Sequence, residues 1–145
     1  MDLAAHTELL LDNYRRSFGE DLVARGAGEA AALMAADFVV LSHGTEADPV
    51  FNYGNAAAQA LFEMDWETLT ALPSRCSAEP LHREERERFL KAVAERGCAD
   101  NYGGVRVSAS GRRFQIAGAR VWNLLDAGGA VVGQAAMFAD WEALD

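Results

Sequence analysis

The chain has 145 residues, half of them hydrophobic, with 22 acidic against 13 basic residues and a formal net charge of −9. This length and composition predict one globular domain with a sizeable core and exclude a disordered chain. Nucleic-acid and membrane partners are not expected, because Lys91 is the single lysine and no apolar run approaches the roughly 20 residues of a membrane span.

Residues 1–36 predict a helical extension ahead of the main domain. One apolar stripe at helical spacing runs along its first half; it consists of Leu3, Leu10, Tyr14 and Phe18. The stripe either folds back onto the chain's own sheet or pairs with a second copy, and we favour a symmetric homodimer. The N-terminal residues do not have the pattern of a secretory signal, so we expect a cytoplasmic protein.

The middle of the chain predicts two short strands followed by helices. The β-branched and aromatic run Phe38–Leu41 is typical of a buried strand. A turn rich in Gly, Asp and Pro separates it from a second strand at Val50–Gly54. Asn55 is the expected N-cap of the next helix, because its side chain can accept from the free amides of the first turn. Further helical segments are expected at Trp66–Leu72 and from Pro80 to Gly97. In the second of these, Leu81 is expected to be buried and His82 to be exposed.

Two patterns in the second half predict which side chains face water. Arg83, Arg86 and Arg88 alternate with glutamates, which is typical of a solvated helix face. Further on, Val105 and Val107 alternate with polar residues, so the valines are expected to form the apolar face of a strand.

The C-terminal part predicts a hairpin and a tail. Strands are expected at about Arg113–Leu125 and Val131–Phe138, joined by a glycine-containing turn, and the tail begins at Asp140. Together these elements predict an α+β domain over residues 37–145. Its five-stranded antiparallel sheet has the order 2-1-5-4-3 and is covered by short helices.

Four stretches of the sequence resemble the MEKHLA domain family, and the overall layout resembles a PAS domain. These stretches are LSHGTEADPVFNYGN, LPSRCSAEP, YGGVRVSASGRRF and VWNLLDAGGAVVGQAAMF. The resemblance implies a PAS-like fold used as a sensory or regulatory module. It carries over no catalytic residue and no settled ligand.

A PAS-like sheet and its helices can enclose a small ligand in a pocket that is mostly apolar with a few polar groups. Polar residues inside the predicted strands are therefore the candidate ligand-binding residues, together with two tryptophans that could stack on a planar ligand. They are Ser42, Asn52, Tyr53, Trp66, Trp122, Asn123 and Gln134. Partners within the protein can satisfy buried amides equally well, and tryptophans often fill a core. A filled interior is thus the alternative.

The sequence requires no cofactor. Cys76 follows Asn55 by 21 residues, a spacing that resembles flavin-binding light-sensing PAS proteins, but the surrounding run PSRCSAEP departs from theirs, so we expect ordinary packing. His43 could ligate haem iron, but its place in a turn favours a local hydrogen bond. The two cysteines and three histidines show no spacing of metal ligands.

No catalytic motif is present, and His43 with Asp48 is the one acid–base pair that an enzyme hypothesis could use. The sequence therefore predicts a PAS-like sensory module that binds a small molecule and signals through its dimer or a separate protein partner. The alternatives are a purely structural dimerisation or interaction module and, third, a small-molecule enzyme or a flavin or haem sensor.

Overall fold

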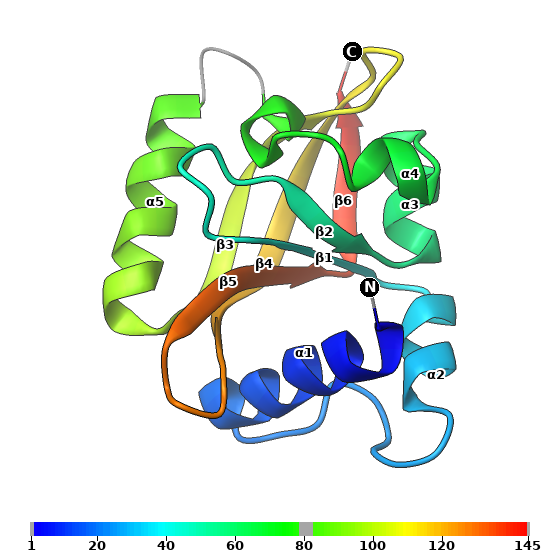
Figure 1. Ribbon diagram of the computed structural model, residues 1–145. Helices are drawn as coiled ribbons and strands as arrows, with labels where there is room; N and C mark the ends of the chain where they lie inside the picture. Colours follow the sequence, from blue (N-terminus) through cyan, green and yellow to red (C-terminus); the bar gives the residue numbers. More distant parts are fainter. Residues whose placement is uncertain (1, 79–82, 145) are drawn as a thin grey trace.

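The computed structural model describes residues 2–78 and 83–144. Its centre is one antiparallel sheet, in which the order β2-β1-β5-β4-β3 confirms the predicted one. The strands are β1 (Val39–His43), β2 (Phe51–Gly54), β3 (Cys98–Val107), β4 (Arg113–Leu125) and β5 (Val131–Phe138). The last and first of these, β5 and β1, lie side by side and so join the two ends of the domain (Figure 1).

A sixth strand, β6 (Asp140–Leu144), replaces the predicted tail. It pairs with the first part of β4, from Ala117 opposite Asp140 to Arg113 opposite Leu144. The ring of Trp141 meets that of Phe138 edge to face at 5.9 Å. Most of β6 is exposed to solvent, so it lacks the apolar alternation by which a strand is identified in a sequence.

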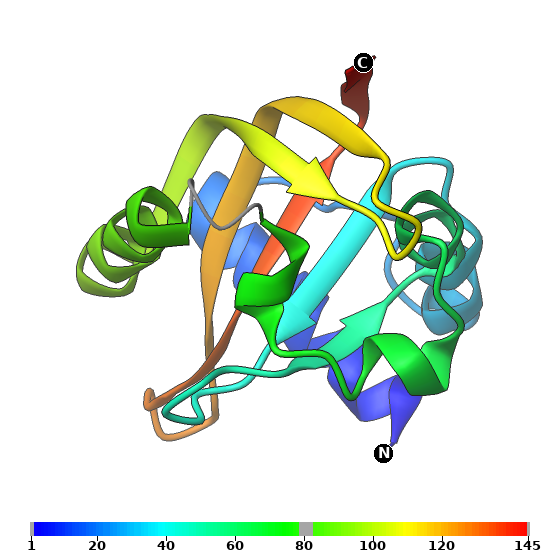
Figure 2. The same cartoon turned by 90° about the horizontal axis from the view of Figure 1, so that it is seen from above.

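Helices cover both faces of the sheet (Figures 1 and 2). On one face lie α1 (Leu3–Phe18) and α2 (Glu29–Ala35), which share an apolar cluster with the strands. The other face carries α3 (Ala56–Phe62), α4 (Trp66–Leu69), the short 3₁₀ helix η1 (Ser74–Ser77) and, along one edge, α5 (Arg83–Arg96). The predictions for Pro80, Leu81 and His82 lie outside the described residues.

Coverage on both faces explains the uninterrupted apolar run in β1. Val39 and Leu41 belong to the cluster under α3 and α4, whereas Val40 belongs to the cluster under α1 and α2. A strand whose two faces are both buried loses the alternation of apolar and polar residues. The run Phe38–Leu41 is therefore apolar throughout.

The N-terminal stripe packs on the chain's own sheet. Leu10 and Tyr14 are buried there, and Trp122 of β4 donates from Nε1 to the carbonyl of Leu10 at 3.2 Å. Asn13 donates to the carbonyl of Leu125 at 3.1 Å. Most of the stripe is therefore covered by the sheet of its own chain. Among the described residues, no helix has both the length and the apolar character to cross a membrane.

Asn55 caps α3 as predicted, and its side chain also bonds to residues outside that helix. Its Oδ1 accepts from the amides of Ala58 and Val40, both at 3.1 Å, and its Nδ2 donates to the carbonyls of Leu33 (3.1 Å) and Phe38 (2.8 Å). One fully buried side chain thus ties together the end of α2, the start of β1 and the first turn of α3.

Candidate functional site

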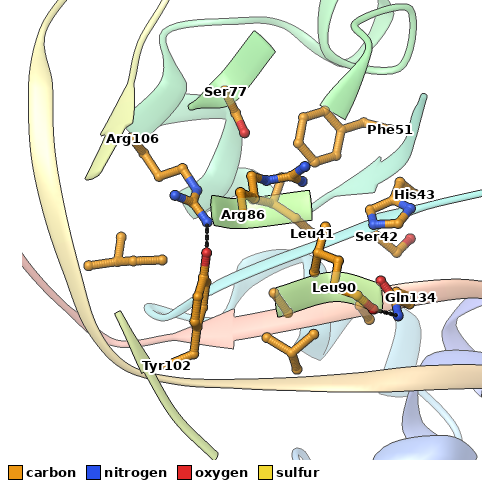
Figure 3. A pocket seen from close by; sticks show the side chains of 14 residues that line it. Leu41, Ser42, His43, Phe51, Ser77, Arg86, Leu90, Tyr102, Arg106 and Gln134 are labelled. Carbon is orange, nitrogen blue, oxygen red and sulfur yellow. Dashed lines mark hydrogen bonds between the residues drawn. The ribbon is translucent and has the colours of Figure 1, made fainter. Parts of the chain in front are cut away.

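A cavity of about 50 Å³ lies between the sheet and α5 (Figure 3). Five strands, η1 and α5 all contribute residues to it. Its apolar side chains include Leu41, Phe51, Leu90, Ile116 and Val121, and its polar ones include His43, Ser77, Arg86, Tyr102, Arg106 and Gln134. None of its described lining residues is an aspartate or a glutamate. This interior space is therefore positively charged, in a chain whose net charge is −9.

The prediction of a solvated helix face is wrong for Arg86. Only 8% of this residue is exposed, whereas Arg88 on the same helix is exposed to solvent. Because Arg86, Leu90 and Val93 follow one another at spacings of four and three, they lie on one side of α5, and that side faces the sheet. Arg86 has neither a hydrogen-bond nor an ion-pair partner within residues 2–78 and 83–144.

The prediction that the polar residues of β3 face water is wrong for Arg106, because this side chain lies in the interior. It is 7% exposed, and it donates to the Tyr102 hydroxyl at 2.7 Å and to the Val105 carbonyl at 2.9 Å. A Cβ on Gly104 would lie 2.9 Å from its Nη1, so the glycine leaves room for the guanidinium. Phe89 of α5 stacks on Tyr102 with ring centroids 3.9 Å apart, which fixes this corner of the cavity.

The two arginines and His43 influence one another electrostatically. Burial, and after it the charge of Arg106, lowers the pKa of Arg86 to about 10, so Arg86 remains a cation at neutral pH. Burial also lowers the pKa of His43, and the charge of Arg86 acts in the same direction. The Nδ1 of His43 donates to the Gly44 carbonyl at 2.9 Å, which confirms the predicted local bond.

A groove outside the cavity leads to it from the surface. It has a volume of about 270 Å³ and shares His43, Arg86, Leu90 and Gln134 with the cavity. Lys91 lies on its wall. Asp48 is also there, where its carboxylate accepts from Arg75 at 3.0 Å. In the predicted acid–base pair, Nδ1 of His43 and the Asp48 carboxylate are therefore bonded to other partners, and the described contacts do not join the two side chains.

Two of the predicted ligand-binding residues, Asn123 and Gln134, are bonded to each other, and of the two Gln134 lines the cavity. Gln134 donates to the Leu90 carbonyl at 3.0 Å and to Oδ1 of Asn123 at 3.1 Å. Asn123 in turn donates to the Ala94 carbonyl at 3.1 Å. This bonded pair of amides attaches α5 to β4 and β5.

The remaining predicted residues lie toward α1 and α2. Tyr53, Trp66 and Trp122 belong to the apolar cluster on that face. Ser42 is among the cavity residues, but its hydroxyl donates to Oδ1 of Asn52 at 2.5 Å and lies 2.9 Å from Nε2 of His6 in α1. Ser42 and Tyr53 thus contact His6, Asn52 is bonded to Ser42, and Trp66 packs on Tyr53. Trp122 lies against α1, and of these residues Ser42 alone also lines the cavity with Gln134.

Tyr53 is the one described residue with a fully buried polar side-chain atom and no hydrogen-bond partner. Burial raises the pKa of its hydroxyl to about 12. The ring of His6 stacks on it at 5.6 Å, and Trp66 meets it edge to face at 5.7 Å. This group therefore holds α1 against β2.

Sequence reasoning missed the two buried arginines. For Arg86 a signal was present, because it precedes Leu90 and Val93 at helical spacing and so shares their apolar face. Cys76 is a half-buried free thiol in η1, outside the residues that line the cavity. Within residues 2–78 and 83–144 no three His, Cys, Asp or Glu side chains gather as metal ligands would.

Comparison with solved structures identifies the fold. The chain is similar to the PAS domain of a protein from Colwellia psychrerythraea, with a TM-score of 0.66 and 13% identity over 79% of this chain and 92% of that one. It is similar to an RNA-binding light-oxygen-voltage receptor (TM-score 0.64, 14% identity), over 85% of this chain and 36% of the receptor. A light-oxygen-voltage domain described with a flavin analogue has a TM-score of 0.62 and 17% identity, over 83% of this chain and 89% of that one.

The sequence comparisons are consistent with the fold. A search of curated proteins finds no match. The MEKHLA domain family matches residues 4–143, a span that includes α1 except its first residue and all six strands except the last residue of β6. The chain therefore belongs to the MEKHLA domain family, and its fold is that of a PAS domain.

Proposed function

We propose that this chain is a sensory module that binds a small molecule in the cavity between the sheet and α5. The observation that carries the proposal is the position of Gln134. This residue lines the cavity and also donates to the Leu90 carbonyl of α5. A molecule that enters the cavity therefore meets one of the bonds that attach α5 to the sheet.

The signal would be a change in the position or stability of α5. The helix is held by the amides of Gln134 and Asn123 and by the stacking of Phe89 on Tyr102. A bound ligand shifts α5 from one position to another only if the ligand makes different contacts with the helix in the two positions. The exposed glutamates and Arg88 on the outer face of α5 would present the change to a separate protein partner.

The alternative function is an interaction module with a filled interior. Two apolar clusters occupy most of the space on both faces of the sheet, and the cavity is small, about 50 Å³. A homodimer remains a proposal as well. Because most of the α1 stripe packs on its own sheet, such a dimer would use its exposed first residue, Leu3, or the exposed side chains of Val131, Val132 and Trp141.

A cavity-filling variant tests the proposed function. Ala136 lines the cavity, and Ala117 is an exposed alanine of β4 that serves as the matched control. Thermal unfolding would be followed with a panel of small metabolites for the wild type, Ala136→Leu and Ala117→Leu. We expect at least one compound to raise the Tm of the wild type and of Ala117→Leu but not of Ala136→Leu. Equal stabilisation of all three proteins, or of none, would contradict a ligand in this cavity.

Hydrogen exchange provides the second measurement. A stabilising compound is expected to change exchange at the amides of α5 more than at those of α1, because α5 borders the cavity and α1 lies on the opposite face. Uniform protection along the chain would indicate general stabilisation and no signal through α5.

A further inference from the structure

Two arginines, Arg86 of α5 and Arg106 of β3, place guanidinium groups at one small interior cavity (Figure 3). We propose that the ligand of this cavity is a small monocarboxylate, whose carboxylate is bound by Arg86 with support from Arg106 and whose short apolar remainder contacts the carbon-lined wall. This inference rests on the proposed function and names the class of molecule that the site takes.

The first argument is the cost of the unpaired charge. A charge removed from water is expensive unless it is paired and hydrogen-bonded. Arg86 is 8% exposed and lies near a second cation, Arg106, which adds repulsion. Glu87, the next residue along α5, is exposed; its charge favours the Arg86 cation, but less than burial and Arg106 oppose it, and it forms no ion pair with Arg86. The nitrogens of Arg86 are not among the fully buried unpaired atoms of the described residues, so the guanidinium keeps some contact with water through the groove. An anion between the two arginines would lower both costs, whereas a neutral ligand would lower neither.

The second argument is the geometry of the donors. A guanidinium presents its N–H groups in a planar fork that matches the two oxygens of a carboxylate. All the N–H groups of Arg86 lack a partner among the described residues. Arg106, by contrast, is held in place by the Tyr102 hydroxyl and the Val105 carbonyl. One arginine is therefore prepared to bind, and the other supplies a fixed positive charge beside it.

The third argument concerns the rest of the ligand. A cavity of about 50 Å³ has room for roughly three to five water-sized groups. Leu41, Phe51, Ile116 and Val121 also line the cavity and present carbon to it. A short-chain acid places its charged end at the arginines and its methyl or methylene groups against these residues. Inorganic phosphate would place oxygens against the same apolar wall and lose their hydration without compensation.

Calorimetric titration with matched ligands tests the class. The probes are sodium acetate, propionate and pyruvate, the neutral isostere propionamide, and inorganic phosphate. The proteins are the wild type, Arg86→Met, which keeps an unbranched apolar side chain and removes the charge, and the control Arg88→Met, which changes an exposed arginine of the same helix. We expect at least one carboxylate to bind the wild type and Arg88→Met equally, and to bind Arg86→Met at least tenfold more weakly. Propionamide should bind at least tenfold more weakly than propionate.

Several results would overturn the inference. Propionamide binding as tightly as propionate, or Arg86→Met binding a carboxylate like the wild type, would show that charge is not recognised here. Tighter binding of phosphate than of every carboxylate, with the same dependence on Arg86, would replace the carboxylate by an inorganic anion. If no carboxylate binds, the inference is wrong. The metabolite panel with Ala136→Leu then shows whether the cavity takes another ligand or the proposed function fails as well.

Discussion

The replacement of Asn55 by alanine is expected to be among the most damaging single changes outside the apolar clusters. The substitution removes a helix cap, which contributes about 1 kcal/mol. It also leaves the carbonyls of Leu33 and Phe38 and the amide of Val40 without this partner. Each buried backbone group left unpaired costs about 1–3 kcal/mol. Allowing for partial relaxation, the free energy of unfolding should fall by about 3–5 kcal/mol.

Urea unfolding followed by circular dichroism measures this loss, and Asp65→Ala is the matched control. Asp65 caps α4 through a single bond to the Thr68 amide at 2.8 Å and lies near the surface, so its loss should cost only about 1 kcal/mol. Asn55→Asp separates the two roles of the amide, because it keeps the acceptor and removes both donors. Equal losses for Asn55→Ala and Asp65→Ala would refute the view that Asn55 holds three elements together.

Three further predictions concern single groups. Burial lowers the pKa of both His6 and His43 in the folded state, so the unfolded chain takes up protons first as the pH falls below the ordinary histidine pKa of 6.5. Stability should therefore be full above that pH and decline below it in urea titrations, and a His6→Gln variant that keeps the whole decline would contradict the role of His6. Tyr53→Phe should raise the unfolding free energy by about 1 kcal/mol, since a buried hydroxyl without a described partner is removed; a loss of stability would reveal a partner. Gly104→Ala should displace the Arg106 guanidinium and weaken carboxylate binding in calorimetry, and unchanged binding would show that Arg106 does not contribute.

Local signals made several strands, their turns and the Asn55 cap predictable. The run Phe38–Leu41, the turn before Asn55 and the glycine hairpin before Val131 each specify a short element by chemistry within a few residues. The order of the strands followed from the sequence of elements and from the need for the chain's two ends to meet. β6 was missed because most of its side chains are exposed on both faces, so no periodic pattern marks it.

The candidate site was harder to predict because both faces of the sheet are covered. The sequence shows that a polar residue within an apolar strand is buried, but it does not show which face of the sheet the side chain occupies. The pairing of β1 with β2 shifts register between Ser42 and His43, so neighbouring residues cannot be assigned to a face by counting. Trp122 and Asn123 illustrate the result, since the first faces α1 and the second attaches α5.

The buried arginines were missed for a different reason. Charged residues are rarely buried without a partner, so Arg86 and Arg106 were assigned to water by their chemical type. Their spacing contained the opposite information for Arg86, which shares its helix face with Leu90 and Val93. A charged side chain that is buried without a described partner departs from this rule, and we expect a ligand at such a position.

One measurement tests the central claim most directly: the unfolding free energy of the wild type and of Arg86→Met, each without ligand and with saturating propionate. Without ligand, Arg86→Met should be the more stable protein, because it replaces a buried cation that has no described partner by an apolar side chain. Propionate should stabilise the wild type and leave Arg86→Met unchanged. A variant that is less stable than the wild type without ligand, or that gains as much from propionate, would contradict an anion site at Arg86.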